Sequence, residues 1–498
     1  MTAPPVPDLD TDLFIGGELV SSDGVPIAVE NPATEEHLAD VPDATPGDID
    51  RAVAAARQAQ RAWAKVDPLS RAELLHECAG RLHDARSALG RTLTLESGKT
   101  LKESVDEVEW CVTAFRHLAE TARASGGRVV GPTKPGQMNF VVHDPVGVAV
   151  LIMPFNYPLA LLAWQAAAAL ATGNACIVKP SELTPLATLQ MARVLDCLPP
   201  GTFNVVTATG AGAARLVDHP GTDMIAFTGS VATGARIMAA AAPRIKKLLL
   251  ELGGSDPFIV AGDAPLETAV PGAAFAAFLN AGQVCTSAER FYVERPLYDE
   301  FMSRLLDTTA RIRVGDPLAD VDVGSMISGP ARDRIARTLD RLHDRGATVL
   351  AGGGVPTGLD RGYFHELTIV EVGDPAGQAP EGEVFGPLAT VTPVDSVDQA
   401  IELANASPFG LGANIYTTSL RTAMRAATEL RAGTVWINDP LKDNDAAPFG
   451  GQKMSGLGRE LGSEGITAFC EPKHVHMDFE AAPSPEWWFP YERPDVDA

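Results

Sequence analysis

The chain has 498 residues, too many for one ordinary hydrophobic core, so we expect two or three domains. Hydrophobic residues make up 45% and charged residues 21%, a balance typical of folded, soluble proteins rather than disordered ones. The 64 Asp and Glu outnumber the 40 Lys and Arg, and the net charge of −24 argues against binding to nucleic acids or to anionic membrane surfaces.

Targeting, membrane and metal signals are weak throughout the chain. The first residues show no basic segment followed by an apolar one, so we expect no signal peptide. The longest apolar stretch, residues 157–173, is interrupted by Gln165 and is too short for a membrane span, so it predicts a buried helix. The six cysteines are scattered without a CxxC pair, which favours a cytoplasmic protein without a disulfide framework or zinc site. His474 and His476 would share a strand face, but no third ligand is near, so we expect no metal.

The predicted elements begin with helices and continue as two α/β series. Residues 48–64 are alanine-rich and amphipathic, and charged residues recur every three to four positions from 70 to 124, which predicts a long helical region. Short β-rich runs follow over 126–158, and apolar strands then alternate with helical segments up to residue 250. A second alternating series runs from 255 to 438. Strands that are apolar on both faces and alternate with helices predict parallel sheets, so the fold class is α/β.

The tail after residue 479 is rich in proline but also in aromatic residues, namely Trp487, Trp488, Phe489 and Tyr491. Purely disordered tails seldom hold so many aromatic side chains. We therefore expect the tail to lie against its own or a partner subunit.

The stretch "FLNAGQVCTSAER", residues 278–290, surrounds Cys285 with small and polar residues. A cysteine in such a setting is an inert core thiol, a metal ligand or a nucleophile, and these residues alone leave the three possibilities open.

Two turns after apolar strands carry polar groups of the kind that hold nucleotides. Gly229 and Gly234 bracket Ser230 between a strand and a helix start, where free backbone N–H groups favour phosphate; the alternative is an ordinary capped turn. Lys179 ends a strand and precedes Glu182, and this pair either contacts ribose hydroxyls or forms a solvated ion pair.

Two further turns carry candidate catalytic groups. Glu251 ends an apolar strand before Gly-Gly, where desolvation would raise its pKa and make it a general base; otherwise it caps the turn or forms a salt bridge. Asn156 lies in the proline-bounded turn "PFNYP", where its amide either stabilises an oxyanion or serves the turn.

Together these motifs resemble the aldehyde dehydrogenase superfamily. The matching segments occur in the family's order and extend from about residue 10 to 480 of the chain. They are "PFNYP" (154–158), "GNACIVKPSE" (173–182), "FTGSVATG" (227–234), "ELGGSDP" (251–257), "GQVCTSAER" (282–290), "EVFGP" (383–387), "GTVWIND" (433–439) and "PFGGQKMSGLGRE" (448–460).

The resemblance implies a mechanism for Cys285, Asn156 and Glu251. Cys285 would be the nucleophile that attacks the aldehyde, and Asn156 would stabilise the oxyanion together with the Cys285 backbone N–H. After hydride transfer leaves a thioester, Glu251 would activate the hydrolytic water. No metal is implied.

The resemblance also implies a nicotinamide cofactor. Lys179 and Glu182 match contacts to the adenosine ribose, Ser230 matches a pyrophosphate contact, and Glu383 and Phe385 match the nicotinamide-ribose pair. The remaining positions of the implied cofactor site are Phe155, Gly210, Gly229 and Leu252. Because a carboxylate at Glu182 would repel a 2′-phosphate, we expect NAD to be preferred over NADP.

The substrate is less determined. Tyr157 and Trp164 match aromatic positions of the family's substrate tunnel. Asp443 and Asp445 precede the segment "PFGG", which is near the mouth of that tunnel. A generic aliphatic or aromatic aldehyde is favoured; a betaine-type or amino-aldehyde, attracted by aromatic faces and carboxylates, is the alternative. A succinic-semialdehyde-type substrate is disfavoured because no arginine stands out to bind its carboxylate.

The family architecture implies a Rossmann-type NAD-binding domain over residues 1–124 and 146–253 and a catalytic domain over 254–464. A small β projection, residues 125–145, with the C-terminal segment 465–498 would join subunits into a homodimer or homotetramer.

Other classes of function fit the sequence less well. A cysteine esterase or acyl-transferase would not need the nucleotide elements, and Glu251 argues against a CoA-acylating enzyme. The intact set of Cys285, Glu251 and Asn156 argues against a non-catalytic paralogue.

Overall fold

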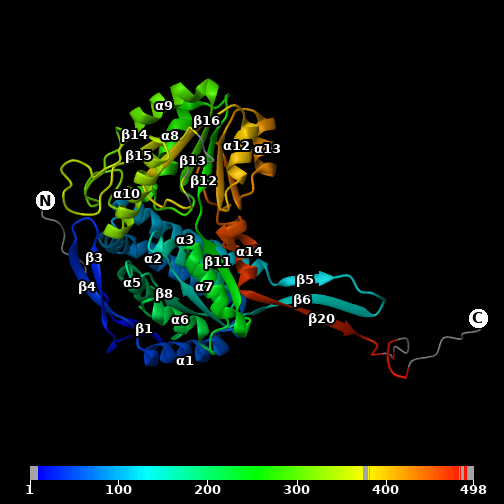
Figure 1. The fold of residues 1–498 in the computed structure, drawn as a ribbon. Helices are drawn as coiled ribbons and strands as arrows, with labels where there is room; N and C mark the ends of the chain where they lie inside the picture. The colour runs from blue at the N-terminus through cyan, green and yellow to red at the C-terminus, as the bar shows by residue number, and fades with distance from the viewer. Residues whose placement is uncertain (1–8, 374–379, 381, 482, 484–486, 491–498) are drawn as a thin grey trace, which may run out of the picture.

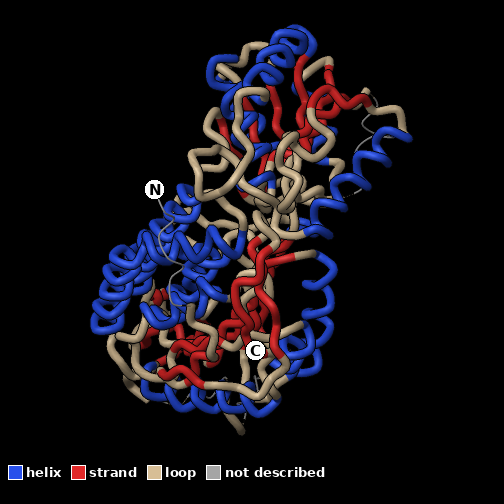
Figure 2. Tube along the Cα trace, turned by 90° about the vertical axis from the view of Figure 1, so that its left-hand side faces the viewer, coloured by secondary structure: helices blue, strands red, loops and turns tan. Residues whose placement is uncertain are grey.

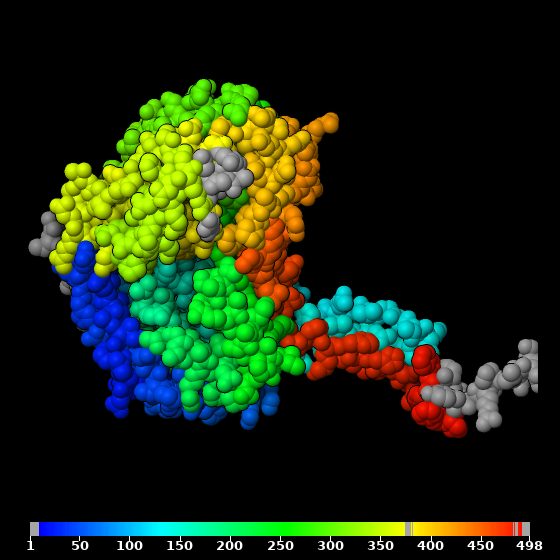
Figure 3. Space-filling view, viewed as in Figure 1, coloured from blue at the N-terminus to red at the C-terminus, as the bar shows by residue number. Residues whose placement is uncertain are grey.

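The computed structural model describes residues 9–373, 380, 382–481, 483 and 487–490. Figure 1 shows two α/β lobes, one above the other, and a narrow arm that projects from the lower lobe. The space-filling view shows the same division, with the arm standing away from the body of the molecule (Figure 3).

The lower lobe is built on an eight-stranded sheet of order β19-β11-β10-β7-β8-β9-β1-β2. Its five central strands are parallel, and β1, β2 and β19 pair antiparallel at the edges. In sheet order the bounds are Gly456–Leu457, Lys247–Leu252, Met224–Gly229, Val148–Ile152, Ala175–Lys179, Phe203–Val205, Leu13–Ile15 and Glu18–Val20. Strands β7 and β8 are buried at every position, as expected of a sheet that helices cover on both faces (Figure 2).

The upper lobe holds a seven-stranded sheet of order β14-β15-β16-β13-β12-β17-β18. All of its pairs are parallel except β14 with β15. In sheet order the bounds are Thr348–Ala351, Thr368–Glu371, Leu388–Val394, Ala288–Glu294, Asp256–Val260, Gly412–Tyr416 and Thr434–Ile437.

The helices flank these two sheets. In chain order α1 to α10 are Pro46–Trp63, Pro68–Ser97, Leu101–Ala124, Pro158–Ala171, Leu186–Val194, Gly210–Asp218, Val231–Ala241, Leu266–Phe278, Arg295–Thr309 and Gly329–Asp344; α12 to α14 are Val397–Asn405, Leu420–Glu429 and Gly462–Ala468. Short 3₁₀ turns occupy Ala242–Arg244, Leu279–Gly282 and Lys453–Ser455. Side chains close in sequence define where several helices begin. Thr45 and Asp48 form a capping box on α1, and Ser230 caps α7.

The helical region expected over residues 70–124 is helical in the structure, but it is divided into two helices. Helix α2 ends at Ser97 and is capped by Gly98, whose φ of 76° is left-handed, and α3 starts with a capping box formed by Thr100 and Glu103. Both signals are present in "SGKTLKE", but the spacing of charged residues continues across the break and conceals it.

The arm consists of the antiparallel sheet β20-β6-β5, with bounds Cys470–Asp478, Gln137–Pro145 and Gly127–Val130. A two-stranded hairpin, β3 (Pro26–Asn31) with β4 (Glu36–Pro42), completes the sheets. The predicted domain boundaries stay a prediction; β19, inside the range expected for the second domain, pairs with β11 of the lower sheet. Among the described helices, none is both long and apolar enough to cross a membrane.

Candidate active site

A cavity of about 820 Å³ opens at the carboxyl ends of the parallel strands of the lower sheet. The chain runs outward from β7 to β8 and β9 and then returns to place β10 and β11 on the other side of β7. Ligands of open α/β sheets bind where the strand order reverses in this way. Residues at or just after the ends of β7, β8, β10 and β11 line the cavity, among them Met153, Lys179, Gly229 and Leu252.

All of the catalytic and cofactor positions predicted from the sequence line this one cavity. They are Phe155, Asn156, Lys179, Glu182, Gly210, Gly229, Ser230, Glu251, Leu252, Cys285, Glu383 and Phe385. The predicted tunnel residues are not part of this lining.

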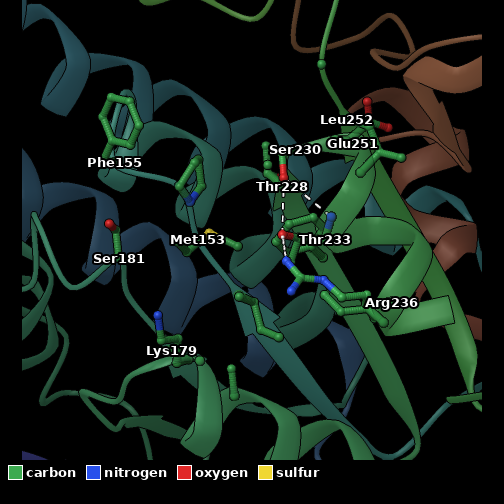
Figure 4. Close-up of a pocket in the computed structure, with 18 of the residues that line it drawn as sticks. Met153, Phe155, Lys179, Ser181, Thr228, Ser230, Thr233, Arg236, Glu251 and Leu252 are labelled. Atoms are coloured by element: carbon green, nitrogen blue, oxygen red, sulfur yellow. Dashed lines mark hydrogen bonds between the residues drawn. The ribbon is translucent and has the colours of Figure 1, made fainter. Parts of the chain in front are cut away.

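The cofactor side of the cavity lies at the start of α7 (Figure 4). Ser230 Oγ donates to Thr233 Oγ1 at 3.1 Å, and the Arg236 guanidinium donates to the same oxygen at 2.9 Å. The helix N-terminus presents backbone N–H groups of the kind that bind phosphate. Apolar residues Ala213, Val217 and Ile237 form an adjacent wall that suits a planar base. These groups fit a dinucleotide.

Lys179, at the end of β8, lies on the other side of the cavity from Arg236 (Figure 4), and Glu182 lines the same cavity. Lys179 is buried, and its Nζ donates to Glu182 Oε2 at 2.9 Å. The ion pair that the sequence left as an alternative therefore exists, and it lines the cavity at the same time.

The nucleophile candidate Cys285 lies between the 3₁₀ turn Leu279–Gly282 and β13. Gly282 has φ of 70°, and a Cβ there would lie 2.2 Å from the Gly386 carbonyl oxygen, so the close approach of these two loops requires glycine. Burial, followed by the charges of nearby carboxyls with Asp256 first, raises the pKa of Cys285 well above its usual value. The thiol of the free protein is therefore neutral near pH 7 and needs a base.

The base candidate Glu251 is buried at the end of β11 beside a second buried carboxyl, Glu460. Burial and the charge of Glu460 raise the pKa of Glu251 well above its usual value. Gln165 of α4 donates to Glu460 at 2.5 Å and to Thr228 at 3.1 Å, whereas neither Glu251 oxygen has a hydrogen-bond partner among the described residues. An unpartnered buried carboxyl that faces the cavity is a group free to accept a proton.

Asn156 is held from both sides of its turn. Its amide donates to the Gln283 carbonyl at 3.1 Å, two residues before Cys285, and Lys99 Nζ donates to its backbone oxygen at 2.7 Å. Lys99 forms a fully buried ion pair with Glu107, whose other oxygen accepts from the Leu159 and Ala160 N–H groups at the start of α4. The turn and the helix after it are thus fixed by α3.

Glu383 and Phe385 project from the loop before β16. Glu383 accepts from the Gly254 N–H at 3.1 Å, and burial raises its pKa to about 8. Phe385 has φ of 52°, a strained conformation for a residue with a Cβ. Its ring packs edge to face against that of Phe155, with ring centroids 5.8 Å apart. Buried Glu289 of β13 accepts from the backbone N–H groups of Val384 and Phe385 at 2.8 and 2.9 Å and so holds this loop.

Of the predicted tunnel residues, Tyr157 immediately precedes α4 and Trp164 lies within that helix. Tyr157 and Trp164 are buried, and neither the Tyr157 hydroxyl nor Trp164 Nε1 has a hydrogen-bond partner among the described residues. Burial raises the pKa of Tyr157 well above its usual value. The charges of Glu103, Glu107, Cys285 and Asp443 raise it further. Asp443 has an exposed side chain, and desolvation by neighbouring protein atoms followed by the charge of Asp445 raises its pKa to about 7.

Sequence reasoning missed several residues of the site. Arg236, Thr233 and Arg334 line the cavity, whereas Glu289 and Glu460 act on residues that do. Arg236 and Thr233 follow the predicted phosphate turn within one helical turn or two and were within reach of a helical projection. Arg334, Glu289 and Glu460 carry no local signal.

Comparison with known proteins agrees with this geometry. Residues 19–475 match the model of the aldehyde dehydrogenase family. The betaine aldehyde dehydrogenase of Brucella canis is 38% identical over 484 residues, which cover 95% of this chain and 98% of that protein.

Solved structures agree as well. A betaine aldehyde dehydrogenase from Staphylococcus aureus in complex with NAD+ has a TM-score of 0.93 and 35% identity and covers 97% of each chain. An NADP-dependent enzyme from E. coli has a TM-score of 0.92 and 33% identity and covers 94% of this chain and 98% of its own. The chain therefore belongs to the aldehyde dehydrogenase family, whose members are NAD(P)-dependent oxidoreductases that act on aldehydes.

Proposed function

We propose that Cys285 is the nucleophile, Asn156 the oxyanion donor and Glu251 the general base of an aldehyde oxidation. The observation that carries this assignment is the convergence of these three side chains on the one cavity that also holds the predicted cofactor residues. The loss of almost all dehydrogenase activity in Cys285→Ser, with cofactor binding retained, is the expected result. Cleavage of an activated ester without cofactor, at a rate that matches aldehyde oxidation, would instead support the esterase alternative.

The residues act in sequence. Glu251 takes the Cys285 proton directly or through a water, and the thiolate attacks the aldehyde carbon. Asn156 and the Cys285 backbone N–H donate to the oxygen as it becomes negative, and the loss of one such donor typically costs about 10²–10³ in rate. The cofactor supplies a hydride acceptor when bound. Glu251 releases the first proton to solvent and, again ionised, deprotonates the water that attacks the Cys285 thioester; the C–S bond breaks, the Cys285 thiolate takes up that proton, and the acid leaves.

NAD is the preferred cofactor in this proposal. Lys179 and Glu182 would hold the adenosine ribose, Ser230 the pyrophosphate, and Glu383 the second ribose, and the Glu182 carboxylate would repel a 2′-phosphate. Arg236, which also lines the cavity, opposes this preference, because its positively charged guanidinium would attract the 2′-phosphate of NADP.

Initial rates with each cofactor test the preference and its cause. We expect kcat/KM to be higher with NAD, Glu182→Gln to raise the use of NADP, and Arg236→Ala to lower it. A higher kcat/KM with NADP in the unmodified enzyme would refute the proposal.

The substrate proposed is an aldehyde that carries a positive charge, of the betaine or amino-aldehyde class. Asp443 lies close enough to both Cys285 and Tyr157 for its charge to act on their pKa values. Trp110 stacks on Tyr157 with ring centroids 5.8 Å apart, so aromatic faces lie beside the carboxylate. Relatives named for betaine aldehyde support this class, which the sequence alone held second to a generic aldehyde.

Asp443→Asn separates the two substrate classes. We expect KM to rise about tenfold for betaine aldehyde, equivalent to about 1.4 kcal/mol of lost attraction, and to change little for hexanal or benzaldehyde. Succinic semialdehyde, which is anionic, should be oxidised better by the variant. An equal effect on all four aldehydes would remove the cationic substrate from the proposal.

Assembly and location complete the proposal. The arm formed by β5, β6 and β20 would join subunits into a dimer or tetramer, as it leaves the body of the subunit with apolar side chains exposed (Figure 3). All six cysteines are free thiols, which fits the reducing cytoplasm.

A further inference from the structure

Two cysteines far apart in sequence meet outside the catalytic cavity. Cys78 is in the middle of α2, and Cys197 lies in the turn between α5 and β9, 119 residues later. Their sulfur atoms are 3.5 Å apart. Cys78 is fully buried, whereas Cys197 is partly exposed, so a small reagent reaches the pair from the side of Cys197.

The surrounding contacts fasten the turn to α2. Arg81, one helical turn after Cys78, forms an ion pair with Asp196 at 2.5 Å, next to Cys197. At the start of α5, Glu96 of α2 accepts from the Leu186 and Ala187 N–H groups at 2.8 and 2.9 Å. The start of α5 and the turn after its end are thus both linked to α2.

The sulfur atoms are close enough to be joined with a small movement. A disulfide bond needs a separation of about 2.05 Å, so the sulfur atoms must approach by about 1.5 Å. Cys197 belongs to a turn rather than to a helix or strand, so it is the partner that can move.

The two thiols have unequal chemistry. A hydrogen bond from Cys78 lowers the pKa of Cys197, and Arg81 lowers it further, although burial and Glu77 act against them. The same hydrogen bond and burial raise the pKa of Cys78. Cys197 is therefore the sulfur that carries thiolate character and solvent access, and Cys78 is a protonated neighbour.

We propose that Cys78 and Cys197 are an oxidisable pair that hydrogen peroxide converts reversibly into a disulfide. The Cys197 thiolate attacks one peroxide oxygen, the O–O bond breaks, and the departing hydroxide is protonated to water, which leaves a sulfenic acid on Cys197. The Cys78 sulfur then attacks that sulfur; the S–S bond forms, the S–O bond breaks, and the hydroxide leaves as water with the Cys78 proton. Two thiols lose two electrons, and the peroxide becomes two waters.

The pair is independent of the proposed catalytic cysteine. Neither Cys78 nor Cys197 lines the cavity that contains Cys285. Reversible disulfides of this kind are the form in which such bonds occur in reducing compartments.

Peptide mapping under non-reducing conditions tests the proposal. The reduced full-length enzyme is treated with hydrogen peroxide, free thiols are blocked with N-ethylmaleimide, and the digest is analysed by mass spectrometry. We expect a cross-linked peptide that contains Cys78 and Cys197, two hydrogens lighter than the two separate peptides and released by dithiothreitol. The cross-link should be lost in Cys78→Ser, where dimedone should instead trap a sulfenic acid on Cys197, and lost in Cys197→Ser.

Two controls make the result decisive. Cys176→Ser, at a fully buried thiol of β8 outside the pair, should leave the cross-link unchanged. Protein unfolded in guanidinium before the peroxide is added should lose the preference for this pair over other cysteine pairs. Oxidation of Cys285 or of any other cysteine without a Cys78–Cys197 cross-link would overturn the proposal, as would a cross-link equally abundant in the unfolded chain.

Discussion

At the scale of single residues, the site is an acidic enclosure around a thiol. Burial raises the pKa of Asp256 and of Glu383 to about 8, and it raises those of Glu251 and Cys285 as well. Each group disfavours charge on its neighbours because protein atoms, rather than water, surround it. The chemistry therefore depends on which carboxyl loses its proton first.

Glu460→Gln should shift the acid limb of the kcat–pH profile to lower pH. Glu251 works as a base only when ionised, and both burial and the charge of Glu460 hold its pKa high. Removal of that charge lowers the Glu251 pKa, so the ionised base is present at lower pH. Initial rates across the pH range measure the shift; Glu464→Gln, at an exposed carboxylate on α14, is the matched control. A limb that stays in place or moves to higher pH would contradict the coupling.

Glu289→Leu should raise KM for the cofactor about tenfold, with a smaller effect on kcat. The N–H groups of Val384 and Phe385, which donate to Glu289, would lose their acceptor, at a cost of about 1–3 kcal/mol for the buried Val384 N–H, and the strained Phe385 would leave its position. Glu289→Gln keeps an acceptor oxygen and should restore most of the affinity. Steady-state kinetics with varied cofactor test this, and an unchanged KM in the leucine variant would argue against a positioning role.

At the scale of elements, the start of α4 depends on another helix. Neither Tyr157 nor Pro158 caps it with a side chain, and Glu107 of α3 accepts its first N–H groups instead. The same carboxyl pairs with Lys99, which donates to the Asn156 carbonyl. A cap supplied across the structure couples the position of Asn156 to the packing of α3, whereas the cap of α1 is local and visible in the sequence.

Lys99→Met should lower the free energy of unfolding by about 3–5 kcal/mol, since it leaves the Glu107 carboxylate buried without its cation. The same change should reduce kcat because Asn156 loses an anchor. Urea titrations measure the stability. Lys102→Met, at the exposed ion pair with Asp106 on α3, the helix that also carries Glu107, should change it by less than about 1 kcal/mol. Equal effects of the two substitutions would show that the buried pair has no special role.

At the scale of the whole molecule, the arm is the feature that a single subunit leaves unexplained. Its described residues expose Val129, Met138 and Met477, and the residues after β20 expose Phe479, Trp487, Trp488 and Phe489. Because Trp487 and Trp488 are mostly exposed in the single subunit, a partner subunit is the predicted contact for these two side chains. A long exposed β sheet with apolar side chains is stable when another surface covers it.

Val129→Asp should lower the mass of the particle in solution. A charge placed in a covered apolar surface opposes association, and Val129 is 74% exposed in the single subunit. Size-exclusion chromatography with light scattering should show a dimer or tetramer for the unmodified chain and a smaller species for the variant. Leu420→Asp, at an equally exposed leucine at the start of α13, should leave the mass unchanged. A monomeric unmodified enzyme would remove the arm from the proposed assembly.

Much of the fold and site was predictable from local signals. Lys179, Gly229 and Leu252 each end an apolar strand before a turn, so their place at the sheet edge follows from a few neighbouring residues. Equally local signals mark the boundary between α2 and α3, although the charge pattern that continues through it led to the prediction of one helical region without an internal boundary.

The sequence by itself determined the strands, the turns that follow them and the side chains that those turns present to a common edge, because turn chemistry and hydrophobic periodicity act over a few residues. Only the tertiary structure decided that Glu460 lies beside Glu251, that Lys99 holds Asn156 and that Cys78 meets Cys197. Each of these contacts joins residues 57 to 209 positions apart. Their proximity depends on how helices pack against a sheet and on the path that the chain takes between the two lobes. Packing over such separations leaves no local pattern in the sequence.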